Sequence, residues 1–175
     1  SDKDLPASLQ ATATTVWAWA RNTMSGLSHL NGKTVSILAD GAVHSQRVVS
    51  AGVITLDRPY TVITAGLPYQ SDLQTLPLAM QVDGGYGQGR MKNVNKVWLR
   101  VYRSSGIFIG PDADNLTEAK QRSTEPYGSP PALKSDEVLV VITPTWADSG
   151  SVYVRQSDPL PLTIVNMTME VAVGA

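Results

Sequence analysis

Two dipeptides that favour tight turns, Asn31-Gly32 and Asp40-Gly41, constrain the fold of this chain more than any other feature. The commonest two-residue hairpin turns need positive φ angles, which Gly, Asn and Asp adopt at the least cost. Between the two turns, Val35 and Ile37 lie on one side of an alternating segment, which is typical of a strand with one buried face. The sequence therefore predicts a β-hairpin whose second strand covers 42–49.

More short strands with similar boundaries follow this hairpin. The segments 53–56 and 60–64 are rich in Val, Ile and Thr, and Gly52 and Gly66 punctuate them. Strands that recur about every ten residues between turn residues indicate a small sandwich or barrel. We expect such a module over 26–68.

The first 25 residues are expected to be a separate segment with one strand. Residues 12–21 are rich in Thr, Ala and Trp, and the strand predicted there places Trp17 and Trp19 on one face. The chain begins at Ser1 without Met, so we expect a fragment of a longer protein or a tag remnant.

Residues 69–175 predict a second, antiparallel β unit. Its clearest strand covers 95–103, and an alternation over 162–173 slips near Asn166, which indicates a β-bulge. Pro77 must lie in the first residues of its strand or at an edge. The other strands are expected over 76–82, 107–109, 137–143 and 151–156. The chain is therefore predicted to be mainly β, with a small β-sandwich or barrel unit and a second antiparallel β unit that carries a long irregular loop.

That loop covers 110–135 and contains four prolines. A connection of this length in a compact domain is usually functional or held by a partner. Asp112 to Asn115 predicts a turn with an N-cap, and 116–122 predicts one or two helical turns. We expect deletion of 115–131 to leave the monomer folded and to abolish assembly. The candidate interface residues are Asn115, Leu116, Arg122, Tyr127 and Pro130 in this loop, and Tyr86 and Arg90 in and beside a Gly-rich loop at 84–89.

The charge balance restricts the partners. Lys and Arg total 14 against 15 acids, so no basic field for binding nucleic acid is expected. Charged residues are 17% of the chain, against roughly 25% in ordinary globular proteins. Such a surface fits either a protein that packs against neighbours or a β domain with polar, uncharged outer faces. No apolar run approaches the roughly 20 residues of a membrane helix.

No constellation of residues points to catalysis, a cofactor or a metal. The chain has no Cys, and its two histidines, His29 and His44, are expected to be ordinary surface residues. The Gly-rich segment 84–90 matches neither the dinucleotide nor the Walker spacing. Asp136 and Glu137 would point to opposite faces of a strand, so they do not form a carboxylate pair. We therefore predict no enzyme. The aromatic residues leave sugar stacking open as an alternative, through Trp17, Trp19, Trp98 and Trp146.

The sequence resembles the C-terminal region of tailed-phage tail structural proteins. The resemblance begins at 26–41, which reads Gly-Leu-Ser-His-Leu-Asn-Gly-Lys-Thr-Val-Ser-Ile-Leu-Ala-Asp-Gly. It continues through Gly66-Leu-Pro-Tyr69, Asn95-Lys-Val-Trp-Leu-Arg-Val-Tyr-Arg103 and Arg155-Gln-Ser-Asp-Pro-Leu-Pro-Leu162. These segments are similar to the nozzle (tail tubular B-like) and tail-hub proteins of short-tailed phages, over roughly 24–175.

The resemblance implies a non-catalytic protein of the virion tail, made in the host cytoplasm, whose partners are other tail subunits. It also implies a ring-shaped homo-oligomer of the full-length protein. The alternative is a module of a phage tail protein that binds host-surface carbohydrate. Neither alternative involves a membrane or a specific nucleic acid, and an enzyme such as a sugar hydrolase is a third, less favoured alternative.

Overall fold

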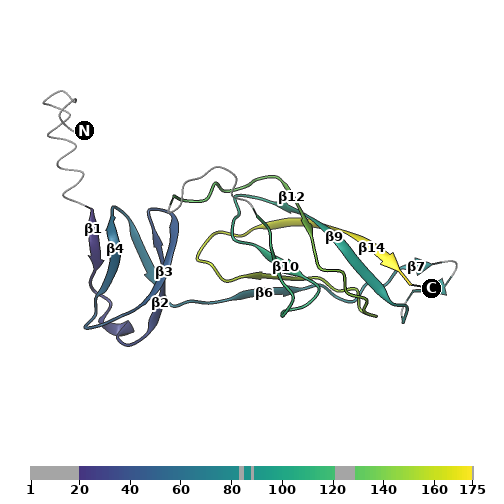
Figure 1. The fold of residues 1–175 in the computed structure, drawn as a ribbon, viewed down its shortest axis with the longest axis horizontal. Coiled ribbons are helices and arrows are strands. Elements are labelled where there is room, and N and C mark those ends of the chain that lie inside the picture. The colour runs from purple at the N-terminus through teal and green to yellow at the C-terminus, as the bar shows by residue number, and fades with distance from the viewer. Residues whose placement is uncertain (1–19, 83–84, 88, 121–128, 175) are drawn as a thin grey trace, which may run out of the picture. The chain divides into compact units, whose positions relative to one another are not determined.

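The computed structural model describes residues 20–82, 85–87, 89–120 and 129–174, and this part of the chain is mainly β, as predicted (Figure 1). The chain divides into two compact units. The first contains Ser1–Pro68 and Pro126–Pro130, and the second contains Tyr69–Glu125 and Pro131–Ala175. The long loop therefore contributes residues to both units, and the strand expected over 12–21 lies almost entirely outside the described residues.

The first unit consists of two small antiparallel sheets. Strand β2 (Thr34–Ala39) lies between β3 (Ala42–Val48) and β5 (Ile63–Gly66), and β1 (Arg21–Met24) pairs with β4 (Ile54–Tyr60). A 3-10 helix, η2 (Ser28–Leu30), precedes the turn at Asn31. The predicted hairpin is confirmed, because Ala39 pairs with Ala42 across a turn in which Asp40 and Gly41 have φ angles of 48° and 80°.

Strand β4 differs from the prediction of two separate strands over 53–56 and 60–64. It runs through Pro59 to Tyr60, which is tolerated because Pro59 has no partner in the β1–β4 ladder. The chain turns instead at Thr61 and Val62, whose N–H groups donate to Asp40 Oδ1 at 3.0 and 2.7 Å. A side chain of the hairpin turn thus fixes where β4 ends. Strand β1 likewise extends to Met24, beyond the strand expected over 12–21.

The second unit is a sandwich of two antiparallel sheets. One sheet has the order β12 (Glu137–Val141), β9 (Lys92–Val101), β14 (Ile164–Val173). The other has the order β11 (Thr117–Glu118), β10 (Phe108–Gly110), β13 (Tyr153–Gln156), β6 (Ser71–Gln74), and a short hairpin joins β7 (Gln81–Val82) to β8 (Gly85–Tyr86). The bulge predicted near Asn166 is confirmed by a register shift between Ile164 and Asn166.

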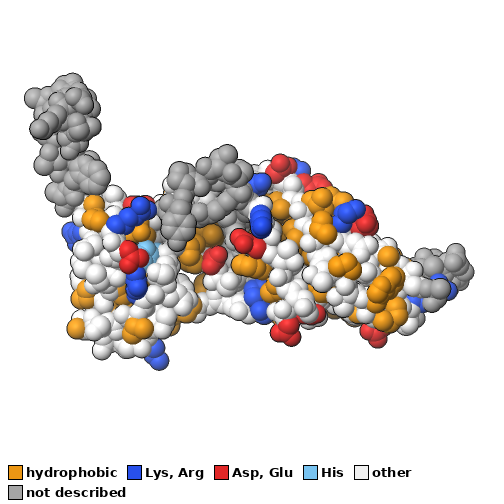
Figure 2. Space-filling model, in the orientation of Figure 1, with side chains coloured by type: hydrophobic (Ala, Val, Ile, Leu, Met, Phe, Trp, Pro, Cys, Tyr) orange, Lys and Arg blue, Asp and Glu red, His pale blue; other side chains and the backbone are white. Residues whose placement is uncertain are grey.

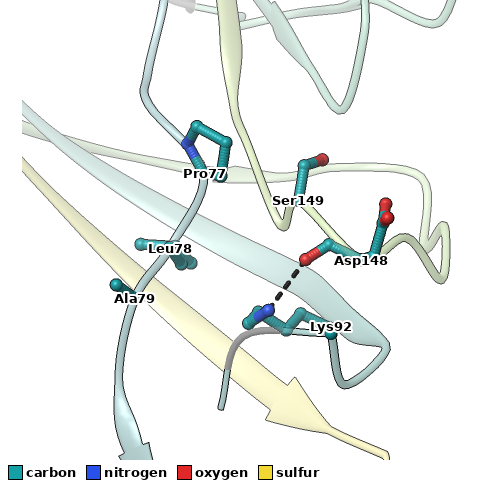
Figure 3. Close-up of a pocket in the computed structure, with 7 residues that line it drawn as sticks. Pro77, Leu78, Ala79, Lys92, Asp148 and Ser149 are labelled. Atoms are coloured by element: carbon teal, nitrogen blue, oxygen red, sulfur yellow. Dashed lines mark hydrogen bonds between the residues drawn. The ribbon is translucent and has the colours of Figure 1, made fainter. Parts of the chain in front are cut away.

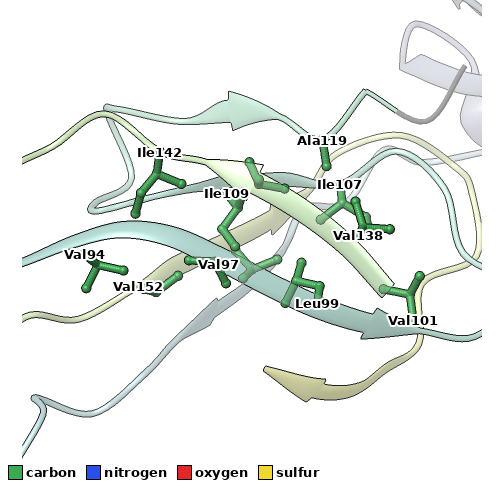
Figure 4. Close-up of a cluster of buried hydrophobic side chains, with 12 residues drawn as sticks. Val94, Val97, Leu99, Val101, Ile107, Ile109, Ala119, Val138, Ile142 and Val152 are labelled. Carbon is green, nitrogen blue, oxygen red and sulfur yellow. The ribbon is translucent and has the colours of Figure 1, made fainter. Parts of the chain in front are cut away.

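One hydrophobic core lies between these two sheets (Figure 4). Val97 and Leu99 of β9 face Ile107 and Ile109 beside and within β10, and all four are fully buried. The alternation read in the sequence over 95–103 therefore marks the core face of β9. Burial of these aliphatic side chains is the main force that holds the two sheets together.

Two predictions for the second unit are wrong. The strand expected over 76–82 reduces to the two residues of β7, and the main strand, β6, lies before Pro77. Pro77 has no N–H for a ladder, and in the chain that follows it Leu78 N donates to Ser149 O and Met80 O accepts from Gly87 N.

The helical turns expected over 116–122 are also absent from 116–120, the part that the structure describes. β11 forms there instead, because Ala119 N donates to Ile107 O at 2.8 Å and the Ala119 side chain enters the core.

Candidate functional site

The predicted interface residues are divided between the two units. Asn115 and Leu116 belong to the second unit, whereas Pro130 belongs to the first. Arg90 is exposed beside the Gly-rich loop, and Tyr86 ends β8. Two further predicted interface residues, Arg122 and Tyr127, lie outside the described residues, as does the side chain of Tyr86.

Asn115 holds a turn together. Asp112 Oδ1 accepts hydrogen bonds of 2.9 Å from the N–H groups of Asp114 and Asn115, and the Asn115 amide donates to both carboxylate oxygens. These bonds lower the pKa of the Asp112 carboxyl; the bond from the Asn115 side chain has the largest effect and the bond from the Asp114 N–H the next largest. The predicted turn is therefore present, but the chain enters β11 and no helix is capped at 116–120.

The loop around Asn115 is also part of the packed structure. A Cβ added at Gly110 would lie 1.8 Å from Asn115 O, so this backbone passes directly over β10. Ala119 is 4% exposed within the core. Deletion of 115–131 would therefore remove a core residue and β11, contrary to our expectation that the monomer would stay folded.

His44 is not the ordinary surface histidine that the sequence suggested. Its side chain is 6% exposed, with Nε2 3.2 Å from Asp57 Oδ2 and Nδ1 2.8 Å from Ser45 O. Arg47 Nη2 donates to the other carboxylate oxygen of Asp57, and the ring of Tyr60 meets the imidazole edge-on. The described residues contain no group of three His, Asp or Glu side chains that could hold a metal ion. This cluster therefore ties β3 to β4.

Lys92 is the most unusual polar residue of the second unit, because it is only 1% exposed (Figure 3). Its ammonium donates to Asp148 O at 2.7 Å and to Arg90 O at 3.1 Å. Its main chain also exchanges hydrogen bonds of 2.7 and 2.9 Å with Ala147. Lys92 therefore fastens the 146–149 segment to the start of β9. Lysine is rarely buried, and no pattern around Lys92 in the sequence signals this role.

A hollow of about 250 Å³ lies beside Lys92. Pro77, Leu78, Ala79, Gly89, Asp148 and Ser149 complete its lining. The acceptors on the ammonium are backbone carbonyls rather than the Asp148 carboxylate, so no acid–base pair is formed with Lys92. The arrangement satisfies a buried charge and offers no nucleophile paired with a base.

The outer face of the β12-β9-β14 sheet carries an aromatic residue between cations. Lys96, Trp98 and Arg100 alternate with the core residues of β9, and Trp98 lies between Leu139 and Thr168 on the neighbouring strands. Lys96 Nζ lies 3.1 Å from Glu170 Oε2, whereas Arg100 forms no ion pair with any described residue. A face of this chemistry can stack on a ring and donate hydrogen bonds around it.

Charged side chains of both signs are scattered over the visible surface, with hydrophobic side chains between them (Figure 2). No helix in the described part of the chain has the length and apolar character that a membrane span requires. Comparison of the sequence with protein-family models found no match, and comparison with curated proteins found none either.

Proposed function

We propose that this chain is a non-catalytic structural module of a bacteriophage tail, of the nozzle or hub type, which acts in virion assembly through contacts with other tail subunits. The observation that carries the proposal is the resemblance of 26–41, and of the segments that continue it, to the C-terminal region of phage tail proteins. In the virion such a module would be one part of a larger oligomer, with a ring as the expected form.

The surface of the second unit supports this proposal. Large apolar side chains are exposed at several places in this unit, including Leu76 at 85% between β6 and β7. A low charged fraction of 17% accompanies them. Apolar surface with few charges is what a protein buries against neighbouring subunits. Other large apolar side chains exposed in this unit include those of Met91, Tyr102, Leu139, Val141, Trp146 and Val165.

Two measurements test the proposal. Purified particles of the phage that encodes the chain should contain its peptides by mass spectrometry, and an antibody raised against the chain should label the tail. Light scattering of the purified chain over a concentration series should reveal a discrete oligomer. Particles that lack the chain would overturn the proposal. A monomer in solution would instead mean that the assembly contacts lie in other parts of the protein.

The outer face of β9 favours a second candidate function, the binding of host-surface carbohydrate. Trp98 offers a ring for stacking, and the polar side chains around it, Lys96, Arg100 and Thr168, offer hydrogen-bond donors. A glycan array with the wild type and with Trp98→Ala tests this candidate. Leu139→Ala, which removes an exposed apolar neighbour without removing the ring, is the matched control. Binding that survives Trp98→Ala would contradict it.

A further inference from the structure

Strand β14 is a ten-residue strand with a neighbour on one side only. Among the described residues it pairs with β9 alone, and it forms one edge of the β12-β9-β14 sheet (Figure 1). Every second residue of an edge strand directs its N–H and C=O away from the sheet, toward solvent or another chain. An edge of this length is a template for a further strand.

The edge lacks most of the features that protect edge strands. It contains no proline and no lysine, and Glu170 is its only charged residue. Register shifts occur between Ile164 and Asn166 and between Glu170 and Val171. Between these irregularities, 166–170 forms five consecutive regular pairs with β9, centred on Thr168. The regular part of the edge is therefore short, defined and accessible.

The core is also open along this edge. Met167 and Met169 pack against the core but are only partly buried, whereas Val97 and Leu99 beside them on β9 are fully buried. A strand added next to β14 would cover these two methionines. Covering apolar side chains favours such an addition, in the same way that it favours folding.

The sequence of the regular segment complements itself. If a second copy is placed antiparallel about Thr168, Met167 lies opposite Met169 on the core face and Asn166 lies opposite Glu170 on the outer face. The apolar pair extends the core, and the Asn amide can donate to the Glu carboxylate. The two Glu170 residues then lie about 14 Å apart along the strand, so each carboxylate faces an amide and not the other carboxylate.

We propose that β14 pairs antiparallel with β14 of a second copy of this chain, about a two-fold axis at Thr168. This proposal rests on the proposed function, because both require the chain to associate with copies of itself. The contact joins two three-stranded sheets into one of six strands. Because a two-fold contact uses the same edge on both copies, it closes at a dimer, and a ring would need a second contact elsewhere.

Cysteine cross-linking tests the register, since the natural chain has no cysteine. Thr168→Cys should give a covalent dimer on mild oxidation, because directly opposed residues bring their Cβ atoms to roughly 5 Å. Asn166→Cys alone should not, since its two copies would lie about 14 Å apart along the strand. A mixture of Asn166→Cys and Glu170→Cys chains should form the mixed dimer.

Leu139→Cys, an exposed position at the opposite edge of the same sheet, is the control for chance collisions. Cross-linking of Leu139→Cys as fast as that of Thr168→Cys would overturn the proposal. So would a wild type that remains monomeric at every concentration. A further pair of variants tests the contact without oxidation: Thr168→Lys should abolish the dimer by opposing two cations, and Leu139→Lys should leave it intact.

The two proposals fail separately. If the chain is found in phage tails but Thr168→Cys does not cross-link, only the β14 contact is wrong. If the dimer forms through Thr168 but the chain is absent from phage particles, only the tail function is wrong.

Discussion

Arg155 and Asp72 lie directly opposite each other on β13 and β6, and Arg155 Nε donates to Asp72 Oδ1 at 2.9 Å. A second bond joins Nη2 to Oδ2 at 3.3 Å, and Nη1 reaches Ala113 O at 3.2 Å. One guanidinium thus connects an edge strand, its neighbour and the loop that carries Asn115. The Arg155 guanidinium also holds the pKa of the Asp72 carboxyl well below its usual range.

This pair predicts an acid-dependent contribution to stability. A depressed carboxyl pKa contributes stability that is present above the ordinary pKa of about 4 and is lost as the pH falls further below it. Asp72→Asn should therefore lower the melting temperature at pH 7, and the difference from the wild type should shrink as the pH falls below about 4. Thermal unfolding followed by circular dichroism measures it. Glu137→Gln, which removes an exposed carboxylate without an ion pair to a described residue, is the control.

Asp158 should behave in the opposite way. Burial, and next the nearby Glu118 carboxylate, raise the pKa of the Asp158 carboxyl. A raised carboxyl pKa costs stability once the pH exceeds the ordinary value of about 4, and the cost is absent at lower pH. Asp158→Asn should therefore raise the melting temperature at pH 7 and leave it unchanged near pH 3. An equal gain at both pH values would show that charge is not the cause.

Lys92→Met should destabilise the second unit although it places an apolar side chain in a buried position. The substitution leaves Asp148 O and Arg90 O without their donor, and we expect a loss of about 2 kcal/mol from unsatisfied buried carbonyls. Urea unfolding followed by tryptophan fluorescence gives the change in midpoint. Lys134→Met, at an exposed side chain, should have little effect. If the Lys92→Met protein were as stable as the wild type, water would have to donate to the two carbonyls in place of the ammonium.

Gly110→Ala should lower the stability of the second unit for a steric reason alone. The new Cβ would lie 1.8 Å from Asn115 O, so the loop must shift away from β10. We expect a loss of about 1–3 kcal/mol, as for other overpacked sites. Gly66→Ala is a matched control in a strand, because no atom lies within 4 Å of its added Cβ. Equal melting temperatures for the two variants would contradict the close packing at Gly110.

The sequence by itself determined the features that depend on neighbours in the chain. The Asp40-Gly41 turn, the strands on either side of it and the alternation of core residues in β9 all follow from local conformational preferences and periodicity. The bulge near Asn166 could be read in the same way, because a slip in an alternating pattern is itself a local signal. These features were enough to define the fold class.

Tertiary structure decided what depends on partners distant in the chain. The pairing of Asp72 with Arg155, the burial of Lys92 and the choice of β11 over a helix at 116–120 each require a group that lies many residues away. Local preference at 116–120 favoured a helix, but the bond from Ala119 to Ile107 and the burial of its methyl group favoured the strand. The open edge at β14 is also a tertiary property, since a strand lies at an edge only because no other strand of the sheet reaches its far side.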